Sequence, residues 1–233
     1  MRRLMVFVLA LCLCLATHAR HKQESKVNYG VKAGFSSTMY DIIRLEVRSA
    51  PISEYSAKSE LSSFFTAFTR FNIKRHYIQT ELSYNISNYS ILFPSNQWDP
   101  TLESSQQSAI NTQINGLEIP IYYGYHILKD GPYGMSFYIG PKAKYVINGH
   151  SRYSFTNFPY SDIEEKILPL NYSLMIGLGV NINRMFFDFS FEYGLHNISQ
   201  GIKSVDSDGA QYTQGIIFDR RKNVLSFSFG FIL

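Results

Sequence analysis

Polar residues, several of them charged, alternate with apolar residues in several extended segments of this 233-residue sequence. In "FFDFSFEYGL", residues 186–195, Asp188 and Glu192 alternate with aromatic residues. Successive side chains of a strand point to opposite faces, so this strand has one polar and one apolar face. The same alternation elsewhere collects four basic and four acidic residues on the polar face: Lys32, Arg70, Lys142, Lys144, Glu81, Glu118, Asp188 and Glu192. If that face is buried, equal numbers of opposite charges predict ion pairs, because an unpaired buried charge is costly.

His196 and Ser199 are the residues that could supply a base and a nucleophile near one end of a barrel. Pairing a nucleophile with its base requires a geometry that one sequence does not give, and no motif surrounds either residue. We therefore interpret His196 as a rim histidine and Ser199 as a loop serine. The sequence predicts no catalytic residue and no enzyme activity.

Metal-ligating residues are scattered along the chain. His76, His126, His150 and His196 stand singly, without the close spacing of a zinc or iron site. The stretch "VDSDG", residues 205–209, is similar to the start of a calcium loop but lacks the closing glutamate, so we interpret it as a solvated turn. We expect no metal and no cofactor.

The basic stretch "DRRK", residues 219–222, precedes the last alternating segment. If the alternating segments are strands of an outer-membrane barrel, this stretch would lie at the level of the lipopolysaccharide phosphates. Arginine is well suited to bind phosphate. Arg220, Arg221 and Lys222 are therefore candidates for a lipopolysaccharide contact. The alternative is a solvated run of charge.

The elements that must position these residues are strands, because the period of hydrophobicity is two along most of the chain. Eight segments alternate in this way: 27–35, 62–71, 77–86, 116–125, 136–146, 173–182, 186–195 and 223–233. The connections between them are long and short by turns. The long connections are roughly 40–59, 88–114, 149–168 and 199–221, and the short ones lie near 73, 130 and 183. An even number of strands with all long loops at one end is typical of outer-membrane barrels, whereas a soluble barrel does not require that arrangement.

Glycines decide which face points inward. Six of them share the polar face with the charges: Gly30, Gly34, Gly140, Gly177, Gly179 and Gly230. Small residues fit the crowded bore of an eight-stranded barrel, which is just wide enough for side chains to fill. The sequence therefore predicts an all-β fold, an eight-stranded antiparallel up-and-down transmembrane barrel with a plugged polar lumen. Its aromatic face, including Phe187, Phe189 and Phe227, should meet lipid.

The first residues predict a cleavable signal peptide. Arg2 and Arg3 precede an apolar stretch, and a small-x-small site ends at Ala19, so we expect residues 1–19 to be removed and residues 20–233 to form one domain. Both cysteines of the sequence lie within the expected signal. Twenty-two basic residues face 18 acidic ones, and removing the two signal arginines leaves about +2. That charge is too small to suggest a nucleic-acid partner.

The chain also resembles a known family. The stretches "VNYGVKAGFSSTM", "YIQTELSYN", "LEIPIYYGY", "FYIGPKAKY", "IGLGVNI" and "FEYGLHNI" are similar, in order and spacing, to the outer-membrane β-barrel domain common in Bacteroidetes and often labelled PorT-like. The resemblance covers nearly all of residues 20–233. It implies an eight-stranded barrel broadly like the small OmpA and OmpX barrels. It supplies no reaction, and the family's name comes from a member similar to proteins needed for protein export.

The leading hypothesis is an integral protein of the bacterial outer membrane that acts as a structural or surface-interaction component of the envelope. Its partners would be outer-membrane lipid, lipopolysaccharide and an envelope protein bound through the outer loops. Two of those loops carry apolar residues that would suit a partner if exposed: Phe93, Pro94, Trp98, Pro100, Tyr212, Ile216, Ile217 and Phe218. The alternative is that these residues fold over the mouth of the barrel and shield it. The alternatives are a lipid- or peptide-modifying barrel enzyme and a soluble ligand-binding barrel. The sequence names neither the ligand nor the partner.

Overall fold

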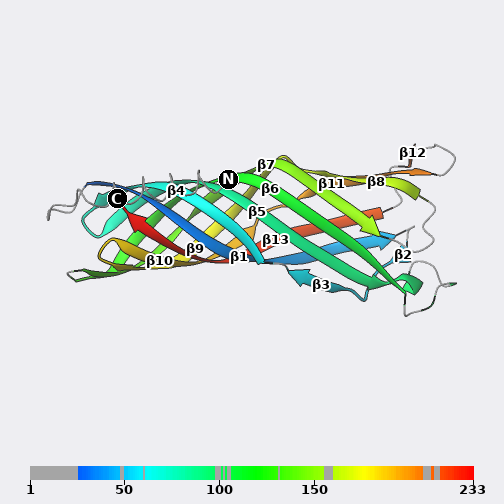
Figure 1. Ribbon diagram of the computed structural model, residues 1–233, viewed down its shortest axis with the longest axis horizontal. Coiled ribbons are helices and arrows are strands. Elements are labelled where there is room, and N and C mark those ends of the chain that lie inside the picture. Colours follow the sequence, from blue (N-terminus) through cyan, green and yellow to red (C-terminus); the bar gives the residue numbers. More distant parts are fainter. Residues whose placement is uncertain are drawn as a thin grey trace, which may run out of the picture.

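Eight long strands close into an antiparallel barrel in the computed structural model, as the alternation predicts (Figure 1). The model describes residues 26–47, 50–59, 61–97, 101, 103, 106–130, 132–154, 160–206, 211–212 and 216–233. The barrel strands are β1 Val27–Val47, β4 Leu61–Ile73, β5 His76–Pro94, β6 Gln107–Asp130, β7 Tyr133–Ser154, β9 Leu170–Ile182, β10 Met185–Gly194 and β13 Ile216–Ile232. Each strand pairs with its neighbour in the chain order of that list, and β1 pairs with β13 to close the barrel. The expected signal peptide, residues 1–19, lies outside the described residues.

Tight turns join the strands at one end of the barrel, which we call the turn end. Ile73 pairs with His76 and Ile182 with Met185, so each of these turns has two residues. Lys74 and Asn183 take φ values of 57° and 58°, the positive values that two-residue hairpins favour. The predicted short connections are therefore confirmed. In outer-membrane barrels such turns face the periplasm.

The predicted long connections are largely wrong, because much of each one is strand. β5 continues to Pro94, β6 begins at Gln107 and β7 continues to Ser154. Smaller elements occupy other parts of these segments: β2 Ala50–Pro51, β3 Ser56–Ser59, the 3-10 helix η1 Ser95–Gln97, β8 Tyr160–Ile167, β11 Ser199–Asp206 and β12 Gln211–Tyr212. We call the part of the barrel that these continuations build the extension.

The wall of the extension is uneven, because β9 and β10 stop nearer the turn end than their neighbours do. The β7–β9 ladder stops at Tyr145 and the β10–β13 ladder at Val224. Beyond these points a second sheet of β8, β11 and β12 lies beside the longer strands (Figure 1). Single backbone hydrogen bonds join the two parts, from Val146 to Pro169 (2.7 Å) and from Ile198 to Arg220 (3.2 Å).

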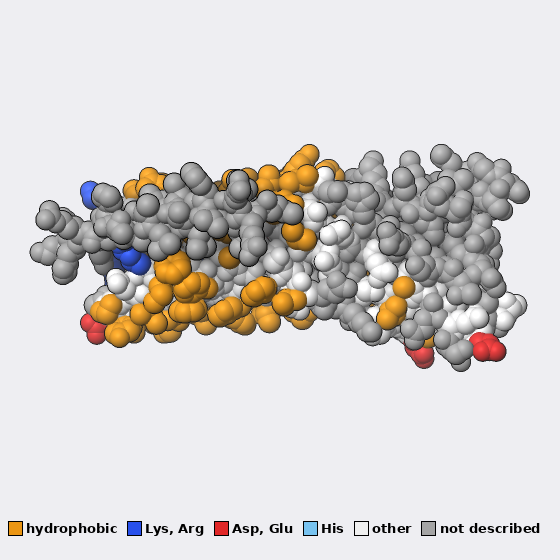
Figure 2. Space-filling view, viewed as in Figure 1, with side chains coloured by type: hydrophobic (Ala, Val, Ile, Leu, Met, Phe, Trp, Pro, Cys, Tyr) orange, Lys and Arg blue, Asp and Glu red, His pale blue; other side chains and the backbone are white. Residues whose placement is uncertain are grey.

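Hydrophobic side chains cover the outer surface of the turn-end half (left in Figure 2). Exposed tyrosines mark both limits of this belt: Tyr29, Tyr125 and Tyr133 near the turns, and Tyr84, Tyr145, Tyr172 and Tyr193 at the other edge. Twelve residues separate Tyr133 from Tyr145 on β7, a span of roughly 30 Å at about 3.3 Å per residue and a tilt near 40°. This height and its aromatic borders match the lipid-facing band of an outer-membrane barrel. In the described part of the chain, no helix is long and apolar enough to span a membrane.

The aromatic row of β10 points outward into this belt. Phe189 and Phe227 are about half exposed. Phe187 is partly covered because its ring centroid lies 5.0 Å from that of Phe229. The outward row thus forms a continuous apolar surface over β10 and β13.

Candidate functional site

Charged side chains fill the middle of the bore. All eight residues of the predicted polar cluster are buried, at 3 to 8% exposure. Lys32 of β1 lies between two acids, 2.7 Å from Glu81 and 3.1 Å from Asp188. Because these three residues come from β1, β5 and β10, the ion pairs link opposite parts of the wall.

A second group of ion pairs lies beside the first, nearer the extension. Glu118 of β6 forms ion pairs with Lys142, at 2.9 Å, and with Lys144, at 3.3 Å. Lys142 also pairs with Glu192, whose other oxygen accepts a hydrogen bond from Ser173 at 2.7 Å. We call the two groups together the ion-pair layer.

Arg70 differs from the prediction, because its guanidinium is held by an amide and by aromatic rings. Its Nε donates to Gln79, and its guanidinium carbon lies 4.5 Å from the centre of the Tyr77 ring. Gln79 in turn donates to Glu81 at 2.7 Å. Arg70 therefore joins the ion-pair layer through Gln79, without an acid of its own.

Aromatic rings close the bore between the ion-pair layer and the turns, and sequence reasoning missed them. Tyr122 and Tyr138 stack with centroids 4.5 Å apart, and Phe68 meets Phe186 edge-on at 5.2 Å. Tyr77 is also buried here and donates to Ser136 at 3.2 Å. We call these five residues the aromatic layer.

Each of four rings in the aromatic layer lies against a glycine directly across the ladder. The pairs are Phe68 with Gly30, Tyr77 with Gly124, Tyr138 with Gly177 and Phe186 with Gly230. A Cβ added to Gly124 would lie 2.0 Å from the Tyr77 ring, so no larger residue fits without movement. The inward glycines thus make room for specific rings. The signal was present in the sequence, as inward aromatic residues that interrupt otherwise polar faces.

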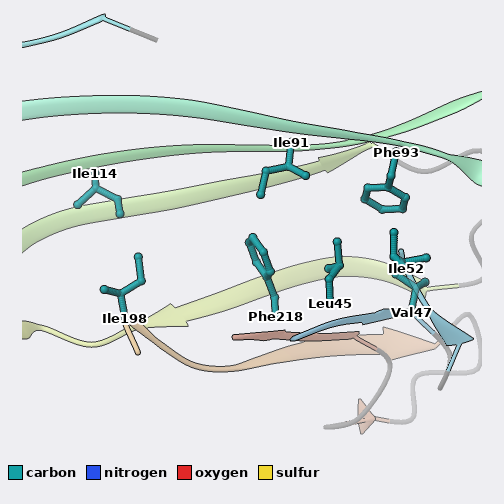
Figure 3. Packing of buried hydrophobic residues seen from close by; sticks show 8 residues of the cluster. All are labelled: Leu45, Val47, Ile52, Ile91, Phe93, Ile114, Ile198 and Phe218. Carbon is teal, nitrogen blue, oxygen red and sulfur yellow. The ribbon is translucent and has the colours of Figure 1, made fainter. Parts of the chain in front are cut away.

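Apolar side chains fill the bore at the opposite end, within the extension (Figure 3). They point toward one another from six strands and connections: Leu45, Val47, Ile52, Ile91, Phe93, Ile114, Ile198 and Phe218. We call this group the apolar cap. The expectation that Phe93 and Phe218 are exposed loop residues is wrong, since they are 1% and 2% exposed. Trp98 and Pro100 lie outside the described residues, as do the side chains of Tyr212 and Ile216.

The predicted lipopolysaccharide contact is corrected for two of its three residues. Arg220 and Lys222 are 0% and 8% exposed, because their positions on β13 point into the bore. Arg220 lies 4.0 Å from the centre of the Phe218 ring, at the lower border of the apolar cap. Arg221 points outward and is partly exposed, and for it the contact stays a prediction.

The cavities left inside the bore have room only for a few water molecules or a small ion. One cavity of about 40 Å³ lies in the ion-pair layer, and one of about 20 Å³ lies between that layer and the apolar cap. A water molecule needs roughly 10 to 15 Å³ of such volume. The described lumen is therefore filled from the turn end to the apolar cap.

The candidate histidines lie in aromatic surroundings, apart from one another. The ring of His126 is tilted against that of Tyr77, with centroids 5.0 Å apart, and the ring centroid of His196 lies 6.0 Å from that of Tyr172. His76 bonds to Tyr123 on the outer surface. Among the described residues, no three His, Cys, Asp or Glu side chains gather as a metal site would require. The side chains of His150 and Ser199, and most of the loop 205–209, lie outside the described residues.

Comparison with known proteins gives the same architecture. Residues 18–200 match the family model described as an outer membrane protein beta-barrel domain. The outer membrane protein OprG from Pseudomonas aeruginosa is similar in structure, with a TM-score of 0.53 and 9% identity over 88% of this chain and 95% of that chain. Neisserial surface protein A has a TM-score of 0.40 and 10% identity, over 90% and 99% of the two chains. No curated protein matches significantly in sequence. At 9% identity the likeness to OprG shows the fold alone.

Proposed function

The chain belongs to the outer membrane protein beta-barrel domain family and is a protein of the bacterial outer membrane, and from this premise we propose that it is a non-conducting surface component of the envelope. In this proposal the extension binds an envelope partner, and the barrel in the membrane anchors it. The observation that carries the proposal is the continuous filling of the bore by the aromatic layer, the ion-pair layer and the apolar cap.

The filled bore argues against a diffusion channel. The lysines of the ion-pair layer each contact at least one acid from another strand. Opening a passage would separate these pairs in a narrow barrel, and an uncompensated buried charge costs several kcal/mol. The apolar cap would also have to unpack, which exposes its side chains to water.

The extension supports the choice of a binding role. β7 continues from Val146 to Ser154 beyond the tyrosine border, roughly 20 Å at about 3.3 Å per residue and a tilt near 40°. Since the apolar cap packs this part internally, its described strands present an ordered surface. A pre-organised surface loses less conformational entropy when it binds.

We further propose that the chain is not an enzyme and that its partner is a protein of an envelope complex. The resemblance to PorT-like barrels of Bacteroidetes makes components concerned with protein export the first partners to test. Outer-membrane lipid and lipopolysaccharide are the remaining proposed contacts, with Arg221 as the outward basic residue on β13. The alternative is a lipid- or peptide-modifying barrel enzyme whose site lies near His196 on the outer rim.

Planar-bilayer recording tests the non-conducting barrel. The purified protein should insert, judged by heat-modifiable migration, and then show no steady conductance in salt solution. The matched control is a variant that replaces Glu118 and Glu192 by glutamine, which breaks the ion-pair layer and should produce current noise or open events. A large, stable channel in the unmodified protein would contradict the proposal.

Affinity capture tests the binding role. Residues 98–105 are replaced by a Gly-Ser linker of equal length, which leaves η1 and both flanking strands in place. The control is Arg184→Gly, in a tight turn at the opposite end of the barrel, which leaves an Asn-Gly turn with Asn183. The intact protein and the turn variant should capture the same envelope proteins, and the loop variant should lose at least one. Identical partner sets in all three would contradict the role proposed for the extension.

A further inference from the structure

Lys222 is a buried cation that lacks a partner in the ion-pair layer. Its side chain points into the bore from β13 and is 8% exposed. Within the described part of the chain, no acidic side chain lies within ion-pair distance of its ammonium group and no hydrogen bond holds it. A buried ammonium in this state is unfavourable unless a counter-charge compensates it.

The neighbouring acids are already occupied by other cations. Lys144 and Lys142 repel the ammonium of Lys222, and Glu192 and Glu118 attract it. Glu118 holds both Lys142 and Lys144, and Glu192 holds Lys142 and the hydroxyl of Ser173. Moving Glu118 to Lys222 would leave Lys144 without an acid, and moving Glu192 would leave Lys142 and Lys144 to share Glu118.

The charge count of this part of the bore shows the same excess. Arg220, the next inward residue on β13, lies outside this group, against the Phe218 ring of the apolar cap. The other five buried cations face the four buried acids Glu81, Glu118, Asp188 and Glu192; these cations are Lys32, Arg70, Lys142, Lys144 and Lys222. The surplus is one positive charge. One monovalent anion would neutralise it.

A cavity of suitable size adjoins Lys222. The space of about 40 Å³ in the ion-pair layer is lined by Lys222 and by serines that can donate hydrogen bonds, Ser36, Ser190, Ser226 and Ser228. Three acids also line it, Glu81, Glu118 and Glu192, and each of them is paired with Lys32 or Lys142 of the same lining. Since one water occupies roughly 10 to 15 Å³ of such volume, the cavity has room for a small ion and little else.

We propose that this cavity binds one small monovalent anion, with chloride as the representative species, against the ammonium of Lys222 and the surrounding serine hydroxyls. The anion completes the charge balance of the ion-pair layer. A divalent anion or one with an organic chain is excluded by the surplus of one charge and by the size of the cavity.

Bromide is the probe that locates the site. Crystals of the full protein grown in sodium bromide should show an anomalous peak within hydrogen-bond distance of Lys222 Nζ. Peaks confined to the exposed basic residues of the turns, or no peak inside the barrel, would overturn the proposal.

Thermal unfolding of the folded barrel tests whether the anion stabilises it. The midpoint should rise by about 3 to 5 °C for each tenfold increase in bromide above half-saturation, with sodium gluconate holding the ionic strength constant. Lys222→Met should abolish this dependence, while the exposed Lys26→Met should retain it. An equal bromide response in Lys222→Met and wild type, or no response in wild type, would overturn the proposal and indicate that the Lys222 amine is neutral.

Discussion

The two halves of the barrel are inverted with respect to each other. In the turn-end half the exterior is apolar, and the interior holds the ion-pair layer and, nearer the turns, the aromatic layer. In the extension the interior is the apolar cap. A single strand makes the change: β5 points Glu81 inward within the belt and Ile91 and Phe93 inward beyond it.

The medium around each half explains the inversion. Lipid is as apolar as a leucine side chain, so burying apolar groups inside the lower half gains little, and its polar groups must satisfy one another. Water surrounds the extension, where burial of apolar surface is favourable by about 25 cal/mol per Å². The same strands therefore enclose paired charges and the aromatic layer in the turn-end half, and depend on aliphatic and aromatic packing in the water-surrounded extension.

The largest expected effect comes from breaking the ion-pair layer. Glu118→Gln removes the acid that Lys142 and Lys144 share, which leaves Lys142 with Glu192 and Lys144 with no acid. The free energy of unfolding should therefore fall by about 3 to 5 kcal/mol. Urea unfolding of the barrel in lipid vesicles measures the change. A loss below about 1 kcal/mol would show that the lower half does not depend on this pair.

Truncating the apolar cap should cost nearly as much. Ile91→Ala removes a fully buried side chain from the extension and should destabilise it by about 2 to 4 kcal/mol. Phe189→Ala is the matched control, because lipid replaces the lost contacts on the outer face of the belt. Protease digestion from the extracellular side should detect earlier cleavage in Ile91→Ala alone. Equal effects of the two truncations would contradict the inversion.

A charge on the lipid face tests the belt itself. Phe189→Arg should destabilise the inserted barrel by about 2 to 4 kcal/mol, the cost of a cation near the bilayer midplane. Heat-modifiable migration after insertion measures the folded fraction. An unchanged folded fraction would contradict the placement of Phe189 against lipid.

The aromatic layer should respond to small changes of volume. A methyl group at Gly124 meets the Tyr77 ring at 2.0 Å, so Gly124→Ala should cost about 1 to 3 kcal/mol. Adding Tyr77→Ala should recover part of that loss, because the clash is removed. Additive effects in the double variant would show that Gly124 does not accommodate this ring.

The sequence was sufficient to predict the strands inside the membrane, because there polar and apolar faces alternate without interruption. It also placed Lys32 and Glu81 on one inward face. The extension was missed, because the arrangement of polar and apolar residues reverses there. Phe93 and Phe218 point inward, whereas in the belt the inward face is the polar one. A search for strands with a polar inward face therefore assigns these segments to loops. The inward position of Arg220 could not be recognised either, since its aromatic contact to Phe218 depends on the strand continuing upward past Lys222.

The smallest expected effect isolates the role of burial. Arg44 and Glu46 form an ion pair with an Nε to Oε1 distance of 2.8 Å, close to the 2.9 Å between Lys142 and Glu118. Arg44 lies on the outer surface, where water and ions screen the attraction and both side chains lose conformational freedom by pairing. Glu46→Gln should therefore leave urea unfolding within experimental error of wild type, although it removes the same chemical group as Glu118→Gln. If the two variants lost equal stability, distance alone would govern these pairs, and the difference between the lumen and the outer surface would have no energetic meaning.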